Sequence, residues 1–228
     1  AIRFAQLDAL VFSPGAGGID DYAEDVSLER DESASGACIA VSLKKLRTSP
    51  DQKSFFDVSL VLTARPELDG DGYDDLVVGA PYYNPATTGN GPGRAYIFYG
   101  ASSFSSTIAA IDADAILEGE SNNDLAGICV TPAGDWDGDG FDDLLIGADG
   151  DDDGGSNAGA AYVVLGPVAG SLSLASADVK LIGENSNDKA GFSLDDIGDM
   201  NSDGYGDVIV GAYQDDTVAS NAGVAHLV

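Results

Sequence analysis

The feature that most constrains the fold of this chain is an internal repeat with a period of 64 residues. Residues 119–127 recur as residues 183–191 with most positions unchanged. An earlier copy is offset by 66 residues where residues 93–100 match residues 159–166. Repeats of this length indicate stacked supersecondary units, because each unit buries its apolar face only against a neighbouring unit.

Short apolar runs, separated by Gly, Asp and Asn, predict four strands in each unit. In the second unit we expect these strands at residues 128–131, 143–147, 160–165 and 179–182. Four short strands in about 60 residues is the size of one β-propeller blade. The runs are apolar at consecutive positions, which indicates strands covered on both faces. The predicted fold is therefore all-β, a partial β-propeller of four-stranded antiparallel blades, with a β-sandwich as the alternative.

The repeat divides the chain into two regions. Residues 55–228 are predicted to form three repeats, at approximately 55–116, 117–180 and 181–228, with the last one truncated. Residues 1–54 do not join the repeat, and we expect a divergent segment or partial blade there, with a strand-like run at 37–43. Propellers close a ring of roughly four to eight blades, so association with further blades or with a second chain is expected.

Charge and composition exclude several classes of partner. The 228 residues carry a formal net charge of -29, which makes nucleic acid an unsuitable partner because phosphate binding needs clustered Lys and Arg. Apolar residues make up 44% of the chain, enough for a folded core rather than a disordered acidic segment. No apolar run approaches the roughly 20 residues of a membrane helix, and residues 1–4 do not begin a secretory leader, so no membrane segment is expected in this chain.

The residue types that usually hold transition metals are scarce. The single histidine, His226, leaves no paired-His zinc site and is expected to be structural. Cys38 and Cys129 are either bonded to each other or two separate thiols, and the sequence leaves both open.

Three acidic loops of nine residues, at 67–75, 135–143 and 199–207, contain the candidate metal-binding residues of the chain. Oxygen-bearing side chains occupy positions 1, 3, 5 and 9 of every loop, and glycine at position 6 permits the positive φ that a sharp reversal needs. Calcium takes six to eight oxygen ligands, among them a backbone carbonyl, for which position 7 is suited. The predicted ligands are Glu67, Asp69, Asp71, Tyr73, Asp75, Asp135, Asp137, Asp139, Phe141, Asp143, Asp199, Asn201, Asp203, Tyr205 and Asp207.

Other interpretations of the loops fit less well. Solvated acidic turns would place Asp and Gly irregularly, not at one spacing kept three times. An EF-hand needs a bidentate Glu at position 12, where this chain has Val78, Ile146 and Val210. Magnesium keeps its waters in a compact octahedron, and zinc and copper lack their nitrogen and sulfur ligands here. The sequence therefore predicts about three bound Ca²⁺ ions.

The order of motifs around the loops resembles a known family. Gly191-Phe192-Ser193, the loop at 199–207, a strand ending in Gly211-Ala212, and Ala222-Gly223 resemble the FG-GAP repeat of integrin α-chain β-propellers. The first copy adds Gly79-Ala80-Pro81, similar to the GAP element. The resemblance covers about residues 55–228, and it implies calcium loops on one rim of the propeller and binding partners on another surface.

These features lead to a hypothesis about function and two alternatives. The leading hypothesis is a non-catalytic, extracellular or cell-surface adhesion or recognition module, stiffened by calcium, with a protein or carbohydrate ligand of unknown identity. The first alternative is the non-catalytic propeller portion of a secreted hydrolase, such as a phospholipase or a polysaccharide-degrading enzyme. The second is adaptation to high salt. No catalytic motif stands in the chain, so it is not expected to be an enzyme. The acidic residues at 149–153 and 215–216 are expected to be solvated.

Overall fold

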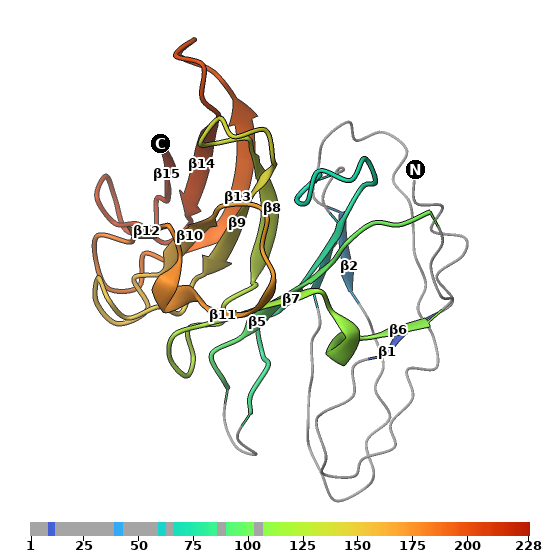
Figure 1. Cartoon of the computed structure of the whole chain (residues 1–228). Helices are drawn as coiled ribbons and strands as arrows, with labels where there is room; N and C mark the ends of the chain where they lie inside the picture. The colour runs from blue at the N-terminus through green and yellow to red at the C-terminus, as the bar shows by residue number, and fades with distance from the viewer. Residues whose placement is uncertain (1–8, 12–38, 43–58, 63–65, 86–89, 103–106) are drawn as a thin grey trace, which may run out of the picture.

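A computed structural model of the chain describes residues 9–11, 39–42, 59–62, 66–85, 90–102 and 107–228 (Figure 1). These residues form fifteen strands and two 3-10 helices, η2 (Ala110–Asp112) and η3 (Leu174–Ser176). The prediction of an all-β chain is confirmed. Within the described ranges, no helix has the length and apolar character needed to cross a bilayer.

The second repeat folds as a complete four-stranded blade, called blade 2 below. Its strands are β8 (Cys129–Gly134), β9 (Asp143–Ala148), β10 (Ala160–Val164) and β12 (Val179–Ile182). They pair antiparallel in the order β12-β10-β9-β8. All four predicted strands are confirmed, with β8 running further than expected, to Gly134, through a register irregularity after Pro132.

The first and third repeats give two further sheets. Blade 1 contains β4 (Leu76–Ala80), β5 (Arg94–Phe98) and β7 (Ala115–Glu118). Blade 3 contains β13 (Ala190–Gly198), β14 (Asp207–Ala212) and β15 (Val224–Leu227), in that order. Three successive sheets with one strand order are the arrangement of a propeller rather than of a two-sheet sandwich, and the described part does not close a ring.

Blade 1 is extended by a strand that comes from the following repeat. The sequence did not predict this pairing. This strand, β11 (Gly170–Ser173), lies in the connection between β10 and β12 of blade 2, yet it pairs in parallel with β7. Blades 1 and 2 are therefore joined by backbone hydrogen bonds in addition to side-chain packing.

The N-terminal region contributes short strands. β1 (Ala9–Val11) pairs in parallel with β6 (Thr107–Ala109), and β2 (Ile39–Ser42) pairs antiparallel with β3 (Ser59–Leu62). The strand expected within residues 37–43 is confirmed by β2. Cys38 lies outside the described residues, and so the prediction about a disulfide between Cys38 and Cys129 also falls outside them.

The core lies between the blades, and β9 shows why its sequence is apolar at consecutive positions. Leu144 and Ile146 belong to the cluster shared with blade 1, whereas Leu145 belongs to the cluster shared with blade 3. All three side chains are fully buried. A Cβ atom added at Gly147 would lie 1.9 Å from the carbonyl oxygen of Gly191, so the GAP-type glycine permits close approach of the two blades.

Candidate metal site

Each of the three acidic loops lies directly before a strand of its blade: β4, β9 or β14. Loops 1 and 2 touch each other through backbone and carboxylate groups. The N–H of Glu67 donates to Oδ2 of Asp142 at 2.9 Å, and the N–H of Asp142 donates to the carbonyl oxygen of Glu67 at 3.0 Å. Loops 1 and 2 therefore lie side by side.

The backbone of the loops follows one pattern, with left-handed residues at positions 4 and 6. The glycines at position 6 have positive φ, as predicted: φ is 86° for Gly72, 98° for Gly140 and 97° for Gly204. Position 4 was not foreseen. There Ser202 adopts a φ of 62°, a conformation that a residue with a Cβ rarely takes.

Close contact between adjacent loops explains the glycine at position 4 of loop 1. A Cβ atom at Gly70 would lie 2.6 Å from the ring atom Cε1 of Phe141, which stands at position 7 of loop 2. The aromatic side chain at position 7 therefore packs on the loop of the preceding blade. The expected metal contact of position 7 uses the backbone carbonyl instead, so the two roles are compatible.

The carboxylate at position 9 holds each loop closed in the same way. In every loop the N–H of position 2 donates to it at 2.7 Å, from Leu68 to Asp75, from Trp136 to Asp143 and from Met200 to Asp207. The carboxylates of Asp75 and Asp143 are also buried and accept a second N–H, from Gly100 at 2.7 Å and from Gly166 at 2.9 Å.

Burial changes the acidity of these groups. It raises the pKa of Asp75 from an ordinary 3.8 to about 6, against the opposing effect of the hydrogen bonds from Gly100 and Leu68. Burial also raises the pKa of Asp143. A buried carboxylate with a raised pKa is a group whose charge is not fully compensated by the protein itself.

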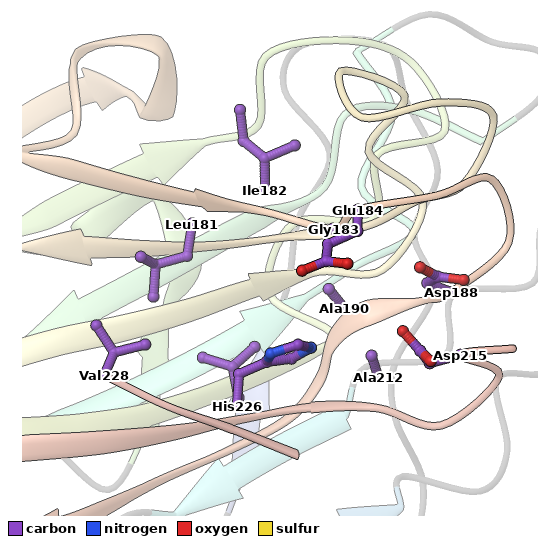
Figure 2. A pocket seen from close by; sticks show the side chains of 11 residues that line it. Leu181, Ile182, Gly183, Glu184, Asp188, Ala190, Ala212, Asp215, His226 and Val228 are labelled. Carbon is purple, nitrogen blue, oxygen red and sulfur yellow. The ribbon is translucent and has the colours of Figure 1, made fainter. Parts of the chain in front are cut away.

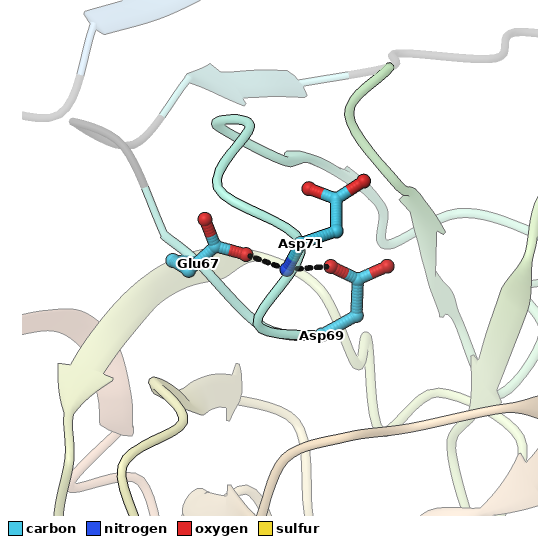
Figure 3. A group of neighbouring side chains, drawn as sticks. All are labelled: Glu67, Asp69 and Asp71. Atoms are coloured by element: carbon cyan, nitrogen blue, oxygen red, sulfur yellow. Dashed lines mark hydrogen bonds between the residues drawn. The ribbon is translucent and has the colours of Figure 1, made fainter.

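Carboxylate oxygens converge in two of the three loops. In loop 1, oxygens of Glu67, Asp69 and Asp71 all lie within 4.8 Å of one another (Figure 3). The N–H of Asp71 donates to Glu67 at 2.9 Å and to Asp69 at 3.1 Å, which fixes both acceptors around the turn. Three hard oxygen donors grouped in this way could hold a metal ion.

Loop 2 gathers a similar trio, made by Asp135, Asp137 and Asp143. The N–H of Asp139 donates to Asp137 at 3.1 Å, and the carboxylate of Asp139 accepts from Phe141 at 2.9 Å. Positions 3 and 5 thus accept from the backbone two residues onward, and the same pattern recurs in the other loops.

Loop 3 keeps the scaffold but has fewer charges. Position 3 is Asn201, whose side-chain oxygen accepts from Asp203 at 2.8 Å and whose amide nitrogen donates to Asp207 at 3.3 Å. Among the described His, Cys, Asp and Glu residues, loop 3 has no group of three within 4.8 Å. The predicted ligands of loop 3 therefore carry less negative charge than those of loops 1 and 2.

The acidic run at residues 149–153 is more ordered than expected. Asp149 and Asp151 are buried rather than solvated. The ammonium of Lys180 lies 2.9 Å from Asp151 and 2.6 Å from Asp153, and it also binds Glu120 at 2.7 Å. This trio of acids could by composition hold a metal, but the lysine already supplies the positive charge. The only sequence signal for this cluster was the 64-residue repeat, which aligns Glu120 with Glu184.

In the absence of calcium, the chain is expected to gain stability as the pH falls from 7 to 5. The folded state binds a proton at Asp75 more tightly than the unfolded state between about pH 4 and 6, so acidification favours folding by about 1 kcal/mol from this group. Calcium favours the ionised carboxylate, so its stabilising effect should shrink over the same range.

Melting temperatures at pH 7 and 5, measured with calcium and after treatment with a chelating resin, check this expectation. Asp75→Asn should lower the pH dependence of the calcium-free chain. A calcium effect that is equal or larger at pH 5 would contradict the assignment of Asp75.

Comparisons with known proteins agree with the geometry. The FG-GAP repeat model matches residues 63–98, which contain loop 1, β4 and β5. The chain is 31% identical to integrin alpha-PS2 of Drosophila melanogaster over 171 residues, which are 72% of this chain and 12% of that protein. It is 32% identical to integrin alpha-5 of Xenopus laevis over 72% of this chain and 15% of that protein, and 32% identical to human integrin alpha-IIb over 73% and 15%.

The repeat, the sheets and these matches define the chain as a set of β-propeller blades built from FG-GAP repeats. It belongs to the FG-GAP repeat proteins of the integrin α-chain type. The chain spans less than a fifth of the length of the integrin chains it matches.

Proposed function

We propose that the chain is a calcium-stabilised, non-catalytic recognition module that works outside the cell or at its surface. The observation that carries this proposal is the common scaffold of the three loops, two of which bring three carboxylates within 4.8 Å. The membership of the FG-GAP family supports the recognition role. The ligand is a protein or a carbohydrate, bound away from the calcium rim.

Each loop binds one ion in this proposal. Side-chain oxygens of positions 1, 3, 5 and 9 and the carbonyl oxygen of position 7 are the ligands, which in loop 2 are Asp135, Asp137, Asp139, Asp143 and Phe141. The ion compensates charges that the protein leaves crowded together, and it takes no part in chemistry. Extracellular modules of this kind bind calcium with dissociation constants of roughly 10⁻⁴ to 10⁻³ M.

Calcium titration by calorimetry tests the proposal. The chain is expected to bind about three ions, and the double variant Asp137→Ala, Asp139→Ala is expected to bind one fewer, because loop 2 loses two of its four side-chain ligands. Asp112→Ala, an exposed acid outside the loops, is the control and should leave the stoichiometry unchanged. An unaltered stoichiometry in the double variant would refute loop 2 as a calcium site.

A further inference from the structure

We propose that loops 1 and 2 bind calcium cooperatively, because a direct contact between the two loops links their proposed ligands. The contact joins Glu67, at position 1 of loop 1, to Asp142, at position 8 of loop 2. This inference rests on the proposed function, which supplies the ions. It adds that these two ions are not bound independently and that loop 3 stands outside the coupled pair.

The contact is a closed pair of hydrogen bonds. The N–H of Glu67 donates to Oδ2 of Asp142 at 2.9 Å, and the N–H of Asp142 donates to the carbonyl oxygen of Glu67 at 3.0 Å. Asp142 thus uses both its backbone and its carboxylate to hold one residue of the other loop. Two bonds between the same two residues fix the relative orientation of the loops, which one bond alone does not.

Close packing surrounds these hydrogen bonds. A Cβ atom on Gly166 would lie 3.1 Å from the carbonyl oxygen of Leu68 in loop 1 and 3.3 Å from Cβ of Phe141 in loop 2. The ring of Phe141 also covers Gly70 of loop 1, as described above. Gly166 donates its N–H to Asp143 at 2.9 Å. A displacement of one loop is therefore transmitted to the other, because a packed junction does not deform freely.

The junction lies between proposed ligands in the chain. Asp142 stands between the carbonyl of Phe141 at position 7 and the carboxylate of Asp143 at position 9. An ion held by these two neighbours restricts the backbone of Asp142, and Asp142 in turn holds Glu67, the first ligand of loop 1. Loop 1 then loses less conformational freedom when it binds its own ion, and this difference is positive cooperativity.

Loop 3 lacks the residue on which the junction depends. Its position 8 is Gly206, which has no carboxylate to accept from position 1 of loop 2. The aromatic contact is also looser: a Cβ atom on Gly138 would lie 3.7 Å from Cε1 of Tyr205, compared with 2.6 Å from Cε1 of Phe141 at Gly70. Loop 3 is therefore expected to bind its ion independently of loop 2.

Nuclear magnetic resonance of the isotope-labelled chain follows each loop separately during a calcium titration. The amide signals of the glycines at position 6, Gly72, Gly140 and Gly204, report on loops 1, 2 and 3. The double variant Asp137→Ala, Asp139→Ala disables loop 2 and should raise the calcium midpoint of Gly72. The midpoint of Gly204 should stay unchanged.

The reverse experiment disables loop 1 with Asp69→Ala, Asp71→Ala and follows Gly140 of loop 2. Because coupling is reciprocal, the product of the two midpoint shifts is the coupling factor, and about tenfold is expected. Each shift is about threefold if the two loops have equal intrinsic affinity. The matched change in loop 3, Asn201→Ala, Asp203→Ala, should move neither midpoint.

Net charge does not produce the same result. Each double variant in loop 1 or 2 removes two negative charges together with the two positive charges of the lost ion. The net charge beside the remaining loop is therefore the same as in the saturated parent chain, and so is most of its attraction for calcium. A shifted midpoint then reports the contact between the loops.

A control for charge is available away from the loops. Glu184, Asp188 and Asp215 gather at one end of a pocket in Figure 2. Glu184 and Asp188 precede β13, whereas loop 3 follows its end at Gly198, so the length of this strand separates them from the loop. Glu184→Gln removes one exposed acid there and should leave all three midpoints unchanged.

Variants of Asp142 test the junction itself. Asp142→Gly copies the residue of loop 3 and keeps every proposed ligand, so it should bind three ions but lose most of the coupling. Asp142→Asn keeps an acceptor oxygen for Glu67 and should retain the coupling. A melting temperature of each variant in calcium separates loss of coupling from loss of the folded blade.

The possible results are distinguishable. If calcium changed the signals of none of the three glycines, the proposed function would be overturned and this inference with it. If all three loops bound calcium and the midpoints of loops 1 and 2 did not move in the disabled variants, the proposed function would stand and the cooperative pair would be overturned. Binding in only one of loops 1 and 2 would also overturn it. Coupling that persisted in full in Asp142→Gly would rule out this junction as the cause.

Discussion

Saturating calcium is expected to raise the melting temperature of the chain by about 10 to 20 °C at neutral pH. An ion that binds only the folded state adds roughly 1.4 to 2.7 kcal/mol per site at 10 to 100 times its dissociation constant. Three sites together give several kcal/mol, and about 2 to 4 °C per kcal/mol is typical for a domain of this size. The effect should be large because the loops gather carboxylates that repel one another when no ion is bound.

Thermal unfolding followed by circular dichroism, in a calcium series from micromolar to millimolar, measures this effect. Magnesium at the same concentrations is the control for general screening of the net charge of -29, and it should shift the melting temperature less. An equal shift with magnesium or with sodium at matched ionic strength would show that charge screening, not a set of specific sites, stabilises the chain. It would also favour the high-salt alternative.

The sequence predicted the blade well where periodicity carries the information. All four strands of blade 2 follow from short apolar runs between turn residues, and the consecutive burial of Leu144, Leu145 and Ile146 follows from sheets packed on both faces. The backbone conformation of the loops at position 6 was equally predictable. Glycine there was expected to adopt a positive φ and does so in all three copies.

Contacts between distant segments were not predictable in the same way. The parallel pairing of β11 with β7 depends on the path of a connection, and a polar sequence such as that of residues 170–173 carries no signal for it. The buried acids Asp149 and Asp151 resembled a solvated turn because local sequence does not reveal that Lys189 lies 3.7 Å from Asp149 and Lys180 lies 2.9 Å from Asp151. Such pairs become visible only when the repeats are placed next to one another in space.

Replacing Asp143 by alanine is expected to destabilise the calcium-loaded chain by about 3 to 5 kcal/mol. This carboxylate is fully buried and accepts hydrogen bonds from the N–H groups of Trp136 at 2.7 Å and Gly166 at 2.9 Å. Removing it leaves both donors without their acceptor, at roughly 1 to 3 kcal/mol each, and it also deletes a proposed ligand of loop 2. Asp143→Ala therefore combines the loss of two backbone hydrogen bonds with the loss of a proposed ligand.

Denaturant titrations with and without calcium separate the two contributions. Without calcium the cost should be smaller, because burial raises the pKa of Asp143 and its removal then relieves an uncompensated charge. Asp143→Asn keeps one acceptor oxygen and should fall between the parent chain and the alanine variant, whereas Asp112→Ala should be nearly neutral. If Asp143→Ala cost the same with and without calcium, this carboxylate would hold the loop to the blade without binding an ion, and the ligand set of loop 2 would have to be redrawn.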